Sequence, residues 1–148
     1  MADIKEFMTT DHRACDDTFA AMEQKANSEG VAAAKDMYEK MAEEMEHHFQ
    51  MEERVLFPAF EEKTGMRQGP TQMMRMEHEQ MRQLIKDVGE AVRNDNKDRF
   101  FGLTETMMIM VQQHNMKEEQ MLYTMVQQHM APEADQLIMM MDAMITEK

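Results

Sequence analysis

Cysteine is nearly absent from this sequence, which contains Cys15 alone. A single cysteine excludes an intramolecular disulfide framework, a CxxC zinc knuckle and a CxxCH haem attachment site. Glycine and proline are also scarce, at five and three residues, which leaves little material for the tight turns of a β-sandwich or barrel. No apolar run approaches the roughly 18 residues that span a bilayer, and the opening MADIKEFMTT lacks the basic and apolar blocks of a signal peptide. We therefore expect a helical protein of the cytoplasm.

Basic residues are few relative to acidic ones. The chain has 16 Lys and Arg against 29 Asp and Glu, for a formal net charge of −13. This charge disfavours binding to phosphate backbones and to anionic lipid, so the composition argues against nucleic acid and membrane surfaces as partners.

Methionine is abundant instead. The sequence has 23 Met, against 16 Leu, Ile and Val together. Met is a good helix former, and the β-branched residues that sheets prefer are scarce, so we predict an all-α fold with a Met-rich core. Two further roles for the Met runs stay open: binding of Cu(I), and reversible oxidation to the sulfoxide.

Breaker residues near positions 27–30, 64–70, 94–96 and 131–132 divide the chain into four long helical stretches and a short tail. In each stretch one face carries a seam of apolar or ligand-type residues with four-three spacing. The four seams are Met8, His12, Cys15, Phe19 and Met22; Met41, Met45, His48, Glu52, Val55 and Ala59; Met74, His78, Met81, Ile85, Val88 and Val92; and Met107, Val111, His114, Glu118, Met121 and Met125. Short links between long helices predict an up-down-up-down four-helix bundle over residues 1–130, with residues 131–148 as a short fifth helix packed on it.

An internal repeat supports the bundle. HFQMEERVLF, which begins at His48, returns 66 residues later as HNMKEEQMLY, which begins at His114. The pair Asp11 and His12 returns at the same offset as Glu77 and His78. Each half is therefore predicted to be a helical hairpin, and two such hairpins would pair about a pseudo-twofold axis.

The histidines of the seams are predicted to share one layer of the bundle. His12 lies 17 residues before the turn near position 29 and His48 lies 19 residues after it, so both sit roughly 25–29 Å from that turn. His78 and His114 stand in the same relation to the turn near position 95. On two of the helices a Glu follows one turn later on the same face.

Such a layer predicts a metal site. Buried carboxylates and imidazoles are costly without compensation, and metal ions satisfy both at once. Imidazole and carboxylate ligands in a bundle core are typical of non-haem diiron or dimanganese sites, with room for a bridging oxide or hydroxide. Open positions at such a site are where dioxygen, peroxide or nitric oxide would bind. The candidate ligands are His12, His48, Glu52, His78, His114 and Glu118.

Several polar neighbours have more than one interpretation. Glu53 and Glu119 are predicted to be outward charges, with Glu119 a possible substitute for Glu118 as a ligand. His47 is rotated by about 100° from His48 on the helix, which favours a supporting or surface role over that of a fifth imidazole. Asp11 and Glu77 are predicted to support the ligands or to be surface charges.

At these residues the chain resembles the hemerythrin-like family, the HHE cation-binding domain. The resemblance covers roughly positions 8–126 and lies in Asp11 and His12, the block HHFQMEERVLFP from 47 to 58, Glu77 and His78, and HNMKEE from 114 to 119. It implies a four-helix bundle with two non-haem iron ions. The six candidate ligands correspond to the family's, and the two Glu correspond to its bridging carboxylates.

The resemblance implies binding of dioxygen or a related small ligand, for carriage, sensing or delivery. The alternatives are a diiron enzyme that acts on peroxide, dioxygen or nitric oxide, and a protein of iron storage or donation. Oxygen-carrying members have HxxxH on the third helix, where this chain has Met74 at the first position, and they place the last carboxylate five residues after its His, where this chain has Glu119. A signalling role would require a separate protein partner.

Overall fold

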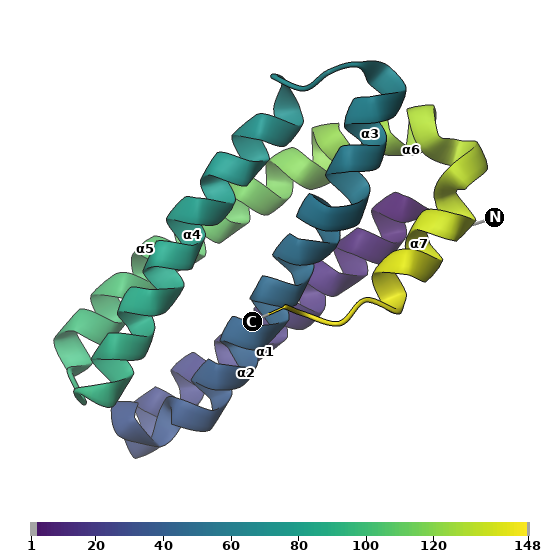
Figure 1. Cartoon of the computed structure of the whole chain (residues 1–148). Coiled ribbons are helices and arrows are strands. Elements are labelled where there is room, and N and C mark those ends of the chain that lie inside the picture. Colours follow the sequence, from purple (N-terminus) through teal and green to yellow (C-terminus); the bar gives the residue numbers. More distant parts are fainter. Residues whose placement is uncertain (1–2, 148) are drawn as a thin grey trace.

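The computed structural model describes residues 3–147, and within that range the chain is helical, with no strand. Long helices run side by side along the molecule (Figure 1). The predicted all-α class is confirmed. The α-helices are α1 (Ile4–Glu29), α2 (Lys35–Met51), α3 (Phe57–Thr64), α4 (Pro70–Arg93), α5 (Lys97–Lys117), α6 (Tyr123–Met130) and α7 (Ala134–Asp142), and the short intervening turns are η1 (Val31–Ala34), η2 (Glu52–Leu56), η3 (Glu118–Leu122) and η4 (Ala131–Glu133).

Local signals explain where the long helices begin and end. The Asp3 side chain accepts a hydrogen bond from the backbone N–H of Glu6 and caps α1, and Asn96 caps α5 in the same way through Arg99. Pro70 begins α4, where its missing N–H costs nothing. Gly65 ends α3 in the left-handed region at φ 76°, which a residue without a Cβ adopts readily.

Helices that follow one another in the sequence pack together. Helix α1 packs against α2, α4 packs against α5, and α2 contacts α4. The later helices close one end of the molecule, where α6 contacts both α1 and α3, and α7 contacts α1 and η2 (Figure 1). None of the described helices is both long and apolar enough to cross a membrane.

The seams predicted for the first and third stretches are buried as expected, but those of the second and fourth shift near their ends. Met121 is 60% exposed, whereas its neighbour Leu122 is buried, and Phe60 rather than Ala59 continues the second seam. The cause is that η2 and η3 are π-helical turns, which have more residues per turn than an α-helix and so move the buried face on by one residue.

The apolar core consists of two clusters. One holds Cys15, Phe19, Met45 and Met81, among others, and the second includes Met8, Met74 and Leu122. Along each long helical stretch the predicted histidine layer falls between the residues of the two clusters. Apolar packing above and below therefore holds the layer and separates it from solvent.

Candidate metal centre

Four imidazoles lie at the centre of the layer, one from each of α1, α2, α4 and α5. Their residues are at most 3% exposed, and those of the two carboxylates beside them are 0% exposed. Each Nε2 atom faces one of these carboxylates. The separations are 3.0 Å from His12 to Oε1 of Glu118, 3.4 Å from His48 to Oε1 of Glu52, 3.1 Å from His78 to Oε1 of Glu52, and 3.2 Å from His114 to Oε1 of Glu118.

On the other side of each ring, the Nδ1 atom meets a second carboxylate. The pairs are His48 with Asp11 at 2.6 Å, His114 with Glu77 at 2.7 Å, His78 with Glu53 at 2.6 Å, and His12 with Glu119 at 2.8 Å. When Nδ1–H donates to a carboxylate, the Nε2 lone pair points to the centre, which is the arrangement of a metal-binding histidine.

The outer carboxylates follow the internal repeat, and two of them do not lie where the sequence predicted. Asp11 and Glu77 occupy equivalent positions and support the histidine of their own half. Glu53 and Glu119 are also equivalent, but each supports the histidine of the opposite half. The prediction that Glu53 and Glu119 are outward charges is therefore wrong, since contacts between helices draw both toward the layer.

The inner glutamates each begin a π-helical turn. The backbone N–H of Phe57 donates to the carbonyl of Glu52, and that of Tyr123 donates to the carbonyl of Glu118, both five residues back. Such π-turns are rare and often lie at functional sites. Pro58 follows the first π-turn closely, but no proline lies near the second. A proline is therefore not the common cause of the two turns, which instead share their position at the inner glutamates.

Tyr123 also lies inside the layer, although none of the predicted helical seams includes it. Its hydroxyl is 2.9 Å from Oε2 of Glu52, 2.9 Å from Oε1 of Glu118, 3.1 Å from Nε2 of His12 and 3.3 Å from Nε2 of His48. The signal was present in the repeat, where an aromatic residue ends both copies but only the second has a hydroxyl.

The six predicted ligands come together in two groups that share Glu118. In each group the candidate ligand atoms all lie within 4.8 Å of one another. One group contains Glu52, His78, His114 and Glu118, and the other contains His12, His48 and Glu118. The layer therefore has room for two ions with a common carboxylate, which is what a bridged pair of metal ions requires.

Other candidates from the sequence lie outside these groups. His47 forms a hydrogen bond through Nδ1 with the hydroxyl of Thr146, at 2.9 Å. Met74 is buried in an apolar cluster, and Glu119 contacts the outer Nδ1 of His12. The structure thus places none of the three among the inner ligand atoms.

The inner nitrogen and oxygen atoms are better suited to binding metal ions than to hydrogen bonding with one another. When each histidine donates its Nδ1–H outward, four Nε2 lone pairs and two carboxylates face the centre. Among the described contacts, the Tyr123 hydroxyl then supplies the one hydrogen that points at these acceptors. Nε2 of His114 is 3.2 Å from Glu118 but too poorly aligned for a hydrogen bond, and Oε2 of Glu118 also has no partner among the described residues. Buried acceptors without donors are costly, and cations satisfy them.

Burial and contact with the inner carboxylates shift the pKa values within the layer. Burial and the repulsion of Glu118 raise the pKa of Glu52 well above its ordinary value. Burial alone would lower the pKa of His12 and of His114, yet contact with Glu118 raises both. The pKa of His48 is lowered instead, to about 4, and that of His78 is also lowered, in both cases mainly by burial.

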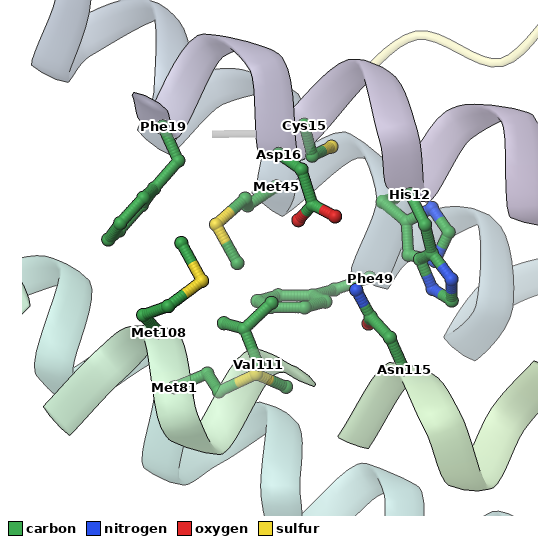
Figure 2. A pocket seen from close by; sticks show the side chains of 11 residues that line it. His12, Cys15, Asp16, Phe19, Met45, Phe49, Met81, Met108, Val111 and Asn115 are labelled. Carbon is green, nitrogen blue, oxygen red and sulfur yellow. The ribbon is translucent and has the colours of Figure 1, made fainter. Parts of the chain in front are cut away.

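A small pocket adjoins one side of the layer. Its volume is about 20 Å³, enough for about one water-sized molecule. His12 and His48 are among the residues that line it, and Figure 2 shows Asp16, Met45 and Met108 around the space. At the equivalent place in the other half, Phe49 stacks on His78 with ring centres 4.4 Å apart, whereas the repeat puts the smaller Asn115 beside His12. This difference leaves space on the His12 side.

The outer carboxylates are expected to tune metal affinity. We predict that Glu53→Ala weakens metal binding about 10- to 100-fold, because Nδ1 of His78 loses the acceptor that orients the ring. Glu52→Ala removes an inner ligand and is expected to have the larger effect. Metal titration of both variants measures the difference, with exposed Glu62→Ala on α3 as the control. Equal affinities for Glu52→Ala and Glu53→Ala would contradict the geometry.

The same carboxylates predict acid sensitivity of the metal-free protein. Burial raises the pKa of Glu77, but hydrogen bonds from Lys117 and His114 outweigh it and lower the pKa below the ordinary 4.5. A carboxyl group whose pKa is lowered by folding stabilises the fold above that ordinary value, and this contribution is lost as the pH falls through the lowered one. We expect the free energy of unfolding to decline below about pH 4.5, and less steeply in Glu77→Gln. Urea denaturation from pH 3 to pH 7 measures this, and parallel curves would refute it.

Comparison with known families gives one match. The family described as Hemerythrin HHE cation binding domain matches residues 3–126. No curated protein and no solved structure shows a significant match. The matched range includes the six inner candidates, their four outer carboxylates and Tyr123.

Proposed function

The chain belongs to the hemerythrin HHE cation-binding family, and from that premise we propose that its His and Glu layer holds two non-haem iron ions and binds dioxygen or a related small ligand. Glu118, which belongs to both ligand groups, would be shared by the two ions, Glu52 would be the second bridging carboxylate that the family resemblance implies, and an oxide or hydroxide would complete the site. Carriage, sensing and delivery are the roles that such binding would serve. The proposal takes the long helical stretches as an up-down-up-down bundle in the cytoplasm, with α7 (Ala134–Asp142) as the short fifth helix packed on it.

The shortage of hydrogens at the centre carries the proposal. Four imidazole Nε2 atoms and two fully buried carboxylates converge, and when each Nδ1–H is donated outward, the Tyr123 hydroxyl has the one hydrogen aimed at them within the described range. Without a cation, Nε2 of His114 and Oε2 of Glu118 have no hydrogen-bond partner among the described residues, and a buried unpaired polar atom costs about 1–3 kcal/mol. Two divalent ions remove this cost, and imidazole with carboxylate suits iron.

The protein's own residues prepare the site for a small ligand. The four outer carboxylates fix the ring orientations, so the ligand atoms need little rearrangement when iron binds. The two apolar clusters limit the access of bulk water. Bound iron supplies the open coordination positions, and the pocket beside His12 and His48 has the size for a diatomic molecule rather than for an organic substrate.

The test is metal content together with the visible spectrum. Protein purified without oxygen is analysed for metals, and the spectrum is recorded before and after air is admitted. We expect about two iron ions per chain, from the two ligand groups, and new charge-transfer bands in air. Reversal under vacuum would favour carriage, and rapid loss of iron to a chelator would favour storage or donation. Little iron, or copper that remains bound after loss of His48 and His114, would refute the proposal.

An enzyme that acts on peroxide, dioxygen or nitric oxide is the second candidate. The pocket favours it, because Met45, Met81 and Met108 line the space beside His12. Thioether sulfur reacts with stray oxidant to give the reversible sulfoxide, which suits a site that handles oxidising species. Turnover of peroxide or nitric oxide by the reduced, iron-loaded protein would identify an enzyme, and binding without turnover would identify a carrier or sensor.

A further inference from the structure

We infer that Tyr123 is a metal ligand, whose phenol oxygen binds the ion of the His12 and His48 group and makes the two metal positions chemically different. The inference rests on the proposed iron site and adds to it a ligand of a third chemical type, which neither the helical seam nor the two groups of His and Glu contain.

The position of the hydroxyl is that of an inner ligand atom. Tyr123 is fully buried, and its oxygen lies 3.1 Å from Nε2 of His12 and 3.3 Å from Nε2 of His48. Both nitrogen atoms are aimed inward by the carboxylates behind them. A tyrosine that served only as packing would have no reason to place its one polar atom among four candidate ligands.

The separations match the coordination shell of one ion. Neighbouring ligands of an octahedral ion with bonds of about 2.1 Å are about 3.0 Å apart, as simple geometry requires. The hydroxyl is 2.9 Å from Oε1 of Glu118, which in turn is 3.0 Å from Nε2 of His12. Tyr123, His12 and Glu118 therefore form one triangular face of such a shell.

The repeat shows that this oxygen belongs to one half only. The residue equivalent to Tyr123 is Phe57, whose ring lies 5.8 Å from that of His78, much as the Tyr123 ring lies 5.5 Å from that of His12. The two rings thus occupy matching places, and the hydroxyl is the difference between them. A metal ion near His78 lacks the phenol, so the two ions differ in ligand charge and type.

Ligation also removes a conflict within the layer. While the phenol keeps its hydrogen, it can donate to Glu52 or to Glu118, but not to both at once. When the oxygen binds an ion, the proton leaves to bulk water and both carboxylates are free to bind metal. The chain's other tyrosine, Tyr38, donates its hydroxyl to the carbonyl of Ile85 at 2.7 Å, and Tyr38 lies in neither metal-binding group.

The experiment compares three proteins: the native chain, Tyr123→Phe and the control Tyr38→Phe. Each is loaded with Fe(II) without oxygen and then oxidised with ferricyanide. Iron content, the visible spectrum and resonance Raman scattering are measured. A phenolate bound to Fe(III) gives a charge-transfer band in the visible range, and excitation in that band enhances the vibrations of the tyrosine ring. Thermal unfolding of the metal-free proteins checks that each variant is folded.

We expect the band and the ring vibrations in the native protein and in Tyr38→Phe, and their complete loss in Tyr123→Phe. The variant keeps bound iron, because its His and Glu ligands are intact. A native protein that binds two iron ions without the tyrosine signal, or a Tyr123→Phe variant that retains the signal, would overturn the inference alone. A native protein that binds no iron would overturn both the inference and the proposed function.

Discussion

Replacement of Glu118 by alanine is expected to abolish the binding of both metal ions. Glu118 belongs to both groups of candidate ligands, and its Oε1 atom lies 3.0 Å from Nε2 of His12 and 3.2 Å from Nε2 of His114. Loss of a supporting outer partner usually costs 10- to 100-fold in metal affinity, so loss of a shared inner ligand should cost more than about 100-fold. Metal titration followed by elemental analysis after dialysis measures the effect.

The matched control for this variant is Glu105→Ala. Glu105 lies on α5, 13 residues before Glu118, and is exposed. Thermal unfolding of the metal-free Glu118→Ala protein checks that it is folded, because removal of one partner from a buried charge cluster destabilises a fold by about 3–5 kcal/mol. A folded Glu118→Ala protein that still holds two ions with native affinity would show that the layer is not the metal site.

The second large effect expected is a metal-dependent gain in stability. The ions bind the folded layer, whose ligands come from four helices far apart in sequence, and the unfolded chain has no such site. Free metal at a thousand times the dissociation constant gives about 4 kcal/mol for each site, or about 8 kcal/mol for two. For a chain of 148 residues this corresponds to a rise in Tm of roughly 15–30 °C.

Thermal unfolding with and without Fe(II), under nitrogen, measures this gain. The Glu118→Ala protein serves as the comparison, because it should show little or no rise. An equal rise in the native protein and in Glu118→Ala would mean that iron stabilises the fold from another place, such as the acidic surface. Absence of any rise in the native protein would contradict metal binding by the folded layer.

Taken together, these variants separate three levels of the site. Glu118 and Glu52 test the inner ligands, Glu53 and Glu77 test the carboxylates behind the histidines, and Tyr123 tests the difference between the two metal positions. Metal content tests the inner ligands, metal affinity and acid stability test the outer carboxylates, and the visible and Raman spectra test Tyr123. The pseudo-twofold arrangement explains why the first two levels come in pairs, whereas the third does not.

The sequence by itself determined the helical class and the layer of six candidate ligands. The helical period and the internal repeat can both be read from the sequence, because the direction of a side chain on a helix follows from its position along the chain. His12 and His78 could therefore be assigned to a common layer before any contact was known. The resemblance to the HHE domain rested on the same residues, and the family match bears it out.

Only the tertiary structure decided which partners stand behind and among these ligands. The regular α-helical period cannot show the π-turns at Glu52 and Glu118, so it placed Met121 in the core, although this side chain is 60% exposed. The roles of Glu53 and Glu119 depend on which histidine of the opposite half each can reach. The hydroxyl of Tyr123 was visible in the repeat, but its contacts depend on how deeply α6 packs against α1. Such contacts join residues distant in sequence, so they are set by packing rather than by periodicity.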